Sequence, residues 1–146
     1  MQNAECIFCK IIAGQIPAAK VYEDDNVLAF MDIGPISDGH VLVVPKRHYE
    51  KVHECPPETL SDVWAKLGKI ACAISMAMSS DGYNILCNNG RAAGQLVDHL
   101  HFHIIPRMTG DGVFNRWQTF KYPEGKIEKL AQKIRLILND NVSNGL

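Results

Sequence analysis

Residues 98–106 carry three histidines at alternate positions, His99, His101 and His103. In a strand, alternate side chains share one face, so the three imidazoles would point the same way, about 6.6 Å apart, with apolar residues turned inward between them. An imidazole with its ordinary pKa of about 6.5 is largely uncharged and nucleophilic near neutral pH. Attack on phosphorus would form a phosphoramidate that water can hydrolyse. The segment therefore predicts nucleophilic catalysis by histidine.

Two other interpretations of the three histidines remain open. One is a solvated polar face, although Thr, Lys or Glu are the more usual residues there. The other is a metal site made of three imidazoles. Ligands at positions i and i+2 can reach one ion, but three from one flat strand reach it with difficulty. Catalysis is the favoured interpretation.

The loop before this segment, residues 88–95, has the sequence Asn-Asn-Gly-Arg-Ala-Ala-Gly-Gln. Its small residues, Gly94 in particular, let the backbone approach a ligand, and its N–H groups can surround an anion. Taken alone, the composition is equally compatible with a plain connection between strands.

Cys6 and Cys9 form a C-x-x-C pair, which is the spacing of half a zinc site. Two more ligands would come from elsewhere, with His48 and His99 as candidates and His53 as the rival of His48. Four protein ligands would close the coordination sphere and make the zinc structural. The alternative is a pair of core cysteines on a short helix.

The remaining sequence predicts the elements that position these residues. Apolar residues recur with a period near 3.6 from position 60 to 78, which indicates a long helix over 57–79. A short helix is predicted at 7–13 and an amphipathic helix at 126–138. Strands are predicted at 20–23, 27–31, 40–44, 83–88 and 96–105. The fold class is therefore α+β, an antiparallel sheet of about five strands with a long helix on one face and a C-terminal helix.

Length and composition narrow the function classes. The 146 residues carry 15 basic and 16 acidic side chains, so a nucleic acid polymer is not an expected partner. The sequence contains no apolar run long enough for a membrane span and no signal peptide at its start, so we expect a cytoplasmic protein. Five cysteines without a secretion signal disfavour a disulfide framework, and Cys72 and Cys87 are predicted to be core residues. One domain is expected over 1–139, followed by a flexible tail at 140–146.

Residues 99–105, His-Leu-His-Phe-His-Ile-Ile, resemble the signature of the histidine triad (HIT) family of nucleotide hydrolases and transferases. The Gly94-Gln95 pair and residues 6–12 and 39–46 are similar as well, so the likeness runs from Cys6 to Arg107. The resemblance implies a HIT-like fold. It also implies a homodimer in which the long helices and central strands of two copies meet.

The resemblance implies a role for each matching residue. His101 would attack the α-phosphorus, His103 would bind the phosphate or the leaving group, and His40 would orient a neighbour. The phosphate would be held by Asn88, Gly94, Gln95 and the backbone N–H of Val97. The base would lie against Ile7, Phe8, Phe30 and Ile33, with Asp32 accepting from the ribose hydroxyls. Zinc-bearing members of the family use the set Cys6, Cys9, His48 and His99.

The implied activity is hydrolysis of dinucleoside polyphosphates or related nucleotides, with a purine favoured, through a nucleotidyl-histidine intermediate. The alternatives are a purine nucleoside phosphoramidase and a nucleotide-binding regulatory protein with little turnover. Leu96 replaces a Ser or Thr that many relatives carry, which bears on the choice of leaving group. Arg116 and Trp117 could meet further phosphates and a second base.

Overall fold

The computed structural model describes residues 3–114, 123–126 and 129–131. The chain divides into two compact units, Met1–Val113 and Phe114–Leu146. In the second unit, residues 126 and 129–131 are helical. Most of the helix predicted at 126–138, the tail at 140–146, and Arg116 and Trp117 lie outside the described residues. A single domain over 1–139 stays a prediction.

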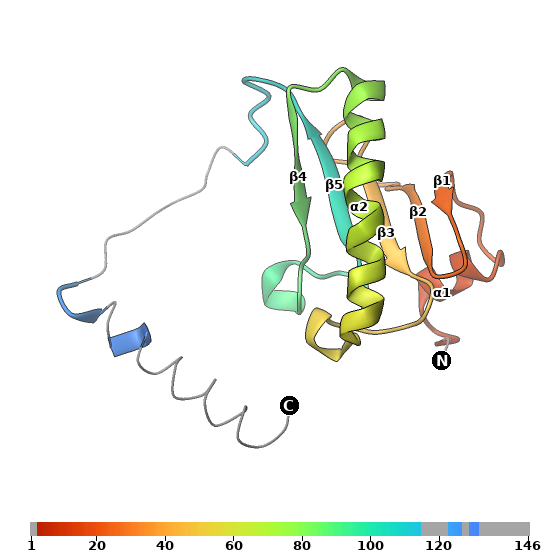
Figure 1. Ribbon diagram of the computed structural model, residues 1–146, viewed down its shortest axis with the longest axis horizontal. Coiled ribbons are helices and arrows are strands. Elements are labelled where there is room, and N and C mark those ends of the chain that lie inside the picture. Colours follow the sequence, from red (N-terminus) through yellow and green to blue (C-terminus); the bar gives the residue numbers. More distant parts are fainter. Residues whose placement is uncertain (1–2, 115–122, 127–128, 132–146) are drawn as a thin grey trace. The chain divides into compact units, whose positions relative to one another are not determined.

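The first unit is built on a five-stranded antiparallel sheet in the order β1-β2-β3-β5-β4 (Figure 1). Its strands are β1 (Lys20–Glu23), β2 (Val27–Met31), β3 (Val41–Pro45), β4 (Gly82–Leu86) and β5 (Phe102–Arg107). Its helices are α1 (Ile7–Ile12), α2 (Pro57–Met78) and two single 3-10 turns, η1 (Val52–Glu54) and η2 (Arg91–Ala93). The α+β class with an antiparallel sheet of five strands is confirmed.

The sheet separates two apolar layers, because β2 and β3 are buried on both faces. Successive side chains of a strand point to opposite faces. One set packs toward α2 and comprises Val27, Ala29, Val41 and Val43. The other set packs with Phe8 and Ile11 of α1 and comprises Leu28, Phe30, Leu42 and Val44. The candidate site described below lies on the α1 face.

Helix α2 lies across the other face of the sheet, as Figure 1 shows. Pro57 occupies its first turn, where the missing N–H costs nothing, and Ser79 ends it in the left-handed conformation at φ 51°. Its buried stripe consists of Val63, Leu67, Ile70, Ala71 and Ile74. No helix among the described residues is long and apolar enough to cross a membrane.

Two predictions are wrong in detail. The strand predicted at 96–105 begins only at Phe102, because the N–H of His99 donates to the Val97 carbonyl at 2.9 Å and turns the backbone. The N–H of Leu100 then donates to Tyr49 outside the sheet. Cys72 is not a core residue, because it lies on the exposed side of α2.

Candidate active site and metal cluster

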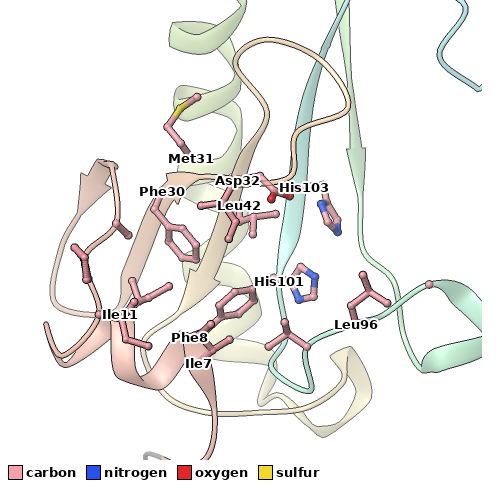
Figure 2. Close-up of a pocket in the computed structure, with 16 residues that line it drawn as sticks. Ile7, Phe8, Ile11, Phe30, Met31, Asp32, Leu42, Leu96, His101 and His103 are labelled. Atoms are coloured by element: carbon pink, nitrogen blue, oxygen red, sulfur yellow. The ribbon is translucent and has the colours of Figure 1, made fainter.

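A pocket of about 270 Å³ opens on the α1 face of the sheet (Figure 2). The ring of Phe8 meets Phe30 edge to face at 5.4 Å between centroids and meets His101 at 5.3 Å. The predicted site residues that line the pocket are Ile7, Phe8, Phe30, Asp32, Ile33, Gly94, Val97, His101 and His103. The structure therefore places the catalytic candidates beside an apolar wall with aromatic rings, against which a planar base could pack.

Several lining residues were missing from the predicted site: Ile11, Ile16, Pro17, Ala18, Met31, Leu42 and Leu96. Leu96 stood out only as a departure from the family pattern, and two of the others had a signal in the sequence. Ile11 follows Ile7 by one helical turn, so it shares the same face of α1. Leu42 pairs with Phe30 across β2 and β3, so the two side chains share a face of the sheet.

Asn88 and Gln95 do not line the pocket. The Gln95 side chain is 1% exposed, and its amide nitrogen donates to the carbonyls of Glu50 at 2.8 Å and Val97 at 3.1 Å. Its oxygen accepts from the N–H of Gly90 at 2.6 Å. The side chain of Gln95 therefore holds the 90–97 loop together from inside.

The ring of His101 is fixed by the backbone. Its Nδ1 lies 2.6 Å from the carbonyl oxygen of His99, and because a carbonyl only accepts, Nδ1 carries the hydrogen. The lone pair of the neutral ring is then on Nε2. Burial lowers the pKa of His101, which keeps the ring uncharged at neutral pH. His101 thus has the tautomer and the charge of a nucleophile.

His103 is oriented by His40. The N–H of Ile36 donates to Nδ1 of His40 at 3.4 Å, so a neutral His40 carries its hydrogen on Nε2, which lies 2.9 Å from Nδ1 of His103. His103 then carries its own hydrogen on Nε2. That atom is buried and has no hydrogen-bond partner among the described residues. It is a donor on a ring that lines the pocket.

Both rings of this pair are neutral at pH 7. Burial, followed by the neighbouring imidazoles of His101 and His40, lowers the pKa of His103 to about 4. Burial also lowers the pKa of His40, against the opposing effect of the Asp32 carboxylate 3.6 Å away. The other oxygen of Asp32 accepts from the N–H of Gly34 at 2.8 Å. This leaves a carboxylate at the pocket wall that can accept from a diol.

The first histidine of the triad, His99, turns away from the pocket into a cluster with two cysteines. Nδ1 of His99 lies 3.4 Å from Sγ of Cys6, 3.7 Å from Sγ of Cys9 and 3.2 Å from Nδ1 of His48. Sγ of Cys9 lies 3.5 Å from Nδ1 of His48. All four predicted metal ligands meet here, whereas the side chain of His53 is 70% exposed elsewhere.

The cluster fits a tetrahedral zinc ion. Zinc bonds of 2.0–2.3 Å imply about 3.3–3.8 Å between donor atoms, close to the distances of the cluster. Nε2 of His99 donates to the carbonyl of Pro45 at 2.9 Å, which leaves the Nδ1 lone pair free for a metal, as is usual for a ligating histidine. Cys6, Cys9, His48 and His99 could therefore hold zinc.

Comparison with known proteins agrees with this geometry. A family model described as HIT domain matches residues 13–110. An uncharacterized HIT-like protein of Methanocaldococcus jannaschii is 57% identical over 107 residues, which cover 73% of this chain and 82% of that protein. A Candida albicans protein named adenosine 5'-monophosphoramidase is 41% identical over 140 residues, with 91% of both chains covered.

One solved structure bears on the metal cluster. The crystal structure of a zinc-bound histidine triad family protein from Mycobacterium smegmatis matches with a TM-score of 0.70 and 36% identity. The match covers 94% of this chain and 97% of that one. A protein similar to this chain over nearly its whole length therefore binds zinc.

Proposed function

The chain belongs to the HIT domain family, and from this premise we propose that it hydrolyses nucleoside phosphoramidates through a nucleotidyl intermediate on His101. The observation that carries the proposal is the 2.6 Å contact between Nδ1 of His101 and the carbonyl of His99. This contact fixes the tautomer in which Nε2 is the nucleophile, in a ring that lines the apolar pocket.

Substrate binding uses the apolar wall of the pocket for the nucleoside and the end with the histidines for the phosphate. The base lies against Phe8, Phe30 and Ile33, and Asp32 accepts from the ribose hydroxyls. The phosphate is held by backbone N–H groups near Gly94 and Val97 and by the Nε2–H of His103, which has no other partner among the described residues. Gln95 and Asn88 act on this site through the shape of the loop.

Two displacements then occur at phosphorus. Nε2 of His101 attacks, the P–N bond breaks, and the amine leaves with a proton taken from solvent. The nucleotidyl-imidazolium keeps its Nδ1–H on the His99 carbonyl, which stabilises the positive charge. Water then attacks phosphorus, releases the nucleoside monophosphate, returns a proton to solvent and restores neutral His101.

The charge of the pocket favours phosphoramidates over dinucleoside polyphosphates. Among the described residues that line it, none is a lysine or an arginine. A leaving group with several negative charges would lack a counterion there, whereas an amine would not need one. The Candida albicans relative is named for a phosphoramidase. Dinucleoside polyphosphates remain the comparison substrate.

Zinc held by Cys6, Cys9, His48 and His99 would have a structural role, because four protein ligands leave no open position.

A homodimer, a purine preference and a cytoplasmic location complete the proposal. The dimer is supported by β4, an edge strand of the described sheet, and by exposed apolar side chains at Trp64 and Met76 of α2. Mass measurement in solution tests it.

The deciding experiment measures release of AMP from adenosine 5'-phosphoramidate and from diadenosine tetraphosphate side by side. The phosphoramidate is expected to have the higher kcat/KM. His101→Ala is expected to abolish turnover and to retain AMP binding, and His53→Ala serves as the matched control because His53 lies outside the pocket. Turnover of the His101→Ala variant at the wild-type rate would exclude this mechanism.

A further inference from the structure

The mouth of the pocket carries apolar side chains that face solvent. Leu96 lines the pocket with 78% of its surface exposed, and Ile7 lines it with 43% exposed. Both residues also line an adjoining hollow of about 290 Å³, so they form a ridge between the two. Large exposed apolar side chains beside a ligand pocket indicate a surface that a ligand covers.

The ridge at Leu96 lies on the side of the nucleophile away from the base-binding wall. In Figure 2, Ile7, Phe8, Phe30 and Leu42 lie on one side of His101, and Leu96 lies on the other. The nucleoside and the leaving group are separate substituents of one tetrahedral phosphorus, so they diverge from it. With the nucleoside against the aromatic rings, the leaving group extends over Leu96.

The charges near the ridge disfavour an anionic leaving group. Glu5 and Asp98 line the adjoining hollow, and Arg91, whose guanidinium lies 3.4 Å from the Asp98 carboxylate, does not line it. None of the described residues lining the hollow is a lysine or an arginine. A leaving group at this place contacts the apolar side chain of Leu96 and meets no cation among the described residues that line the hollow.

Resting on the proposed function, we infer that Leu96 selects the leaving group, and that the primary amine displaced from phosphorus carries an alkyl or aryl chain that packs on Leu96. The P–N bond breaks as the bond from Nε2 of His101 to phosphorus forms, and the amine nitrogen takes one proton from solvent. The apolar chain takes no part in the bond changes and contributes binding energy alone. Leu96 is thus a specificity residue for the leaving group.

The test compares two adenosine 5'-phosphoramidates made from amines of similar basicity, phenethylamine and ethanolamine. The ratio of their kcat/KM values is expected to favour phenethylamine by about tenfold, which is what a few buried carbons typically provide. Leu96→Ser is expected to bring this ratio close to one. Met108→Ser, which alters an exposed apolar side chain outside the pocket, is expected to leave the ratio unchanged.

The possible failures are distinguishable. If neither phosphoramidate is hydrolysed, the proposed function falls and this inference with it. If both are hydrolysed with equal kcat/KM, or if Leu96→Ser leaves the ratio unchanged, the inference alone is overturned. AMP affinity of the Leu96→Ser variant, measured by calorimetry, checks that the nucleoside side of its pocket is intact.

Discussion

The carbonyl oxygen of His99 accepts a hydrogen bond from Nδ1 of His101, while the imidazole of the same His99 lies in the Cys–His cluster. The nucleophile and the candidate metal site therefore share one residue. Its side chain is held by the cluster and by Pro45, and its backbone holds the ring of His101. Any displacement of the cluster moves the acceptor that fixes the catalytic tautomer.

Loss of metal is expected to impair catalysis more than nucleotide binding. Elemental analysis should find one zinc per chain, and chelation or Cys9→Ser should remove it and lower kcat by about 10- to 100-fold, as loss of an orienting contact does. AMP affinity should change much less. Nitrogen NMR of the His101 ring should then show both tautomers.

Cys72→Ser is the matched control for the metal experiment, because it removes an exposed thiol outside the cluster. It should leave zinc content and kcat unchanged. Metal-free protein with full kcat and a single His101 tautomer would contradict the coupling.

Substitution of His40 is expected to act through His103. His40→Phe removes the donor to Nδ1 of His103, so His103 can adopt the tautomer that lacks the Nε2–H. Loss of one hydrogen bond to the transition state should lower kcat by about tenfold, with little change in KM. His40→Asn, which keeps a side-chain donor, should recover part of the loss, and equal losses in both variants would argue for packing alone.

Stability is expected to fall as the pH falls from 6.5 toward 4. Unfolded histidines take up protons near pH 6.5, whereas burial holds the pKa of folded His103 to about 4. The unfolded state therefore binds more protons in this window, and the free energy of unfolding should decrease by up to about 1.4 kcal/mol per pH unit for this residue. Between pH 7.5 and 5.5, urea unfolding should show a smaller decrease in the free energy of unfolding for His103→Asn than for the wild type. An identical decrease in both proteins would contradict the assignment of this pH dependence to His103.

Gln95→Leu is expected to destabilise the fold, since it removes the partners of three backbone groups at a site that is 1% exposed. Unpaired buried groups of this kind cost about 1–3 kcal/mol each, so a loss of about 2–4 kcal/mol should appear in urea unfolding after partial relaxation. Asn88→Ala should change stability little, because the one side-chain hydrogen bond of Asn88 to a described residue is the 3.5 Å contact with the Gly94 carbonyl. Equal effects would contradict the bracing role of Gln95.

The strands were predictable where local chemistry marks their ends. Between β1 and β2, the carboxylate of Asp24 accepts from the N–H groups of Asn26 and Val27, so the turn is encoded in adjacent residues. The residues of β2 and β3 that face α1 were also predictable as a set, because alternation follows from strand geometry. Pro57 similarly marked the start of α2.

Features that depend on distant contacts were not predictable from local patterns, and the set Cys6, Cys9, His48 and His99 was predicted only through the family resemblance. The alternation of the three histidines suggests one shared face, but His99 turns into a cluster formed with Cys6, Cys9 and His48 from other segments. Nothing local distinguishes His48 from His53 as a partner. Gln95 resembles a ligand contact by composition, yet its side chain is buried, and one of its hydrogen bonds runs to Glu50, 45 positions earlier.

The two-sided burial of β2 and β3 separates two kinds of sequence change. Even-numbered positions such as Phe30 and Leu42 face the α1 side with the pocket, and odd-numbered positions such as Ala29 and Val43 face α2. Substitutions among the residues that face α1 can therefore alter substrate preference, while the residues that face α2 stay unchanged and maintain the packing of the sheet on the helix. A single-residue deletion in either strand would turn the side chains beyond it to the opposite face of the sheet, and both the pocket and the packing on α2 would be lost.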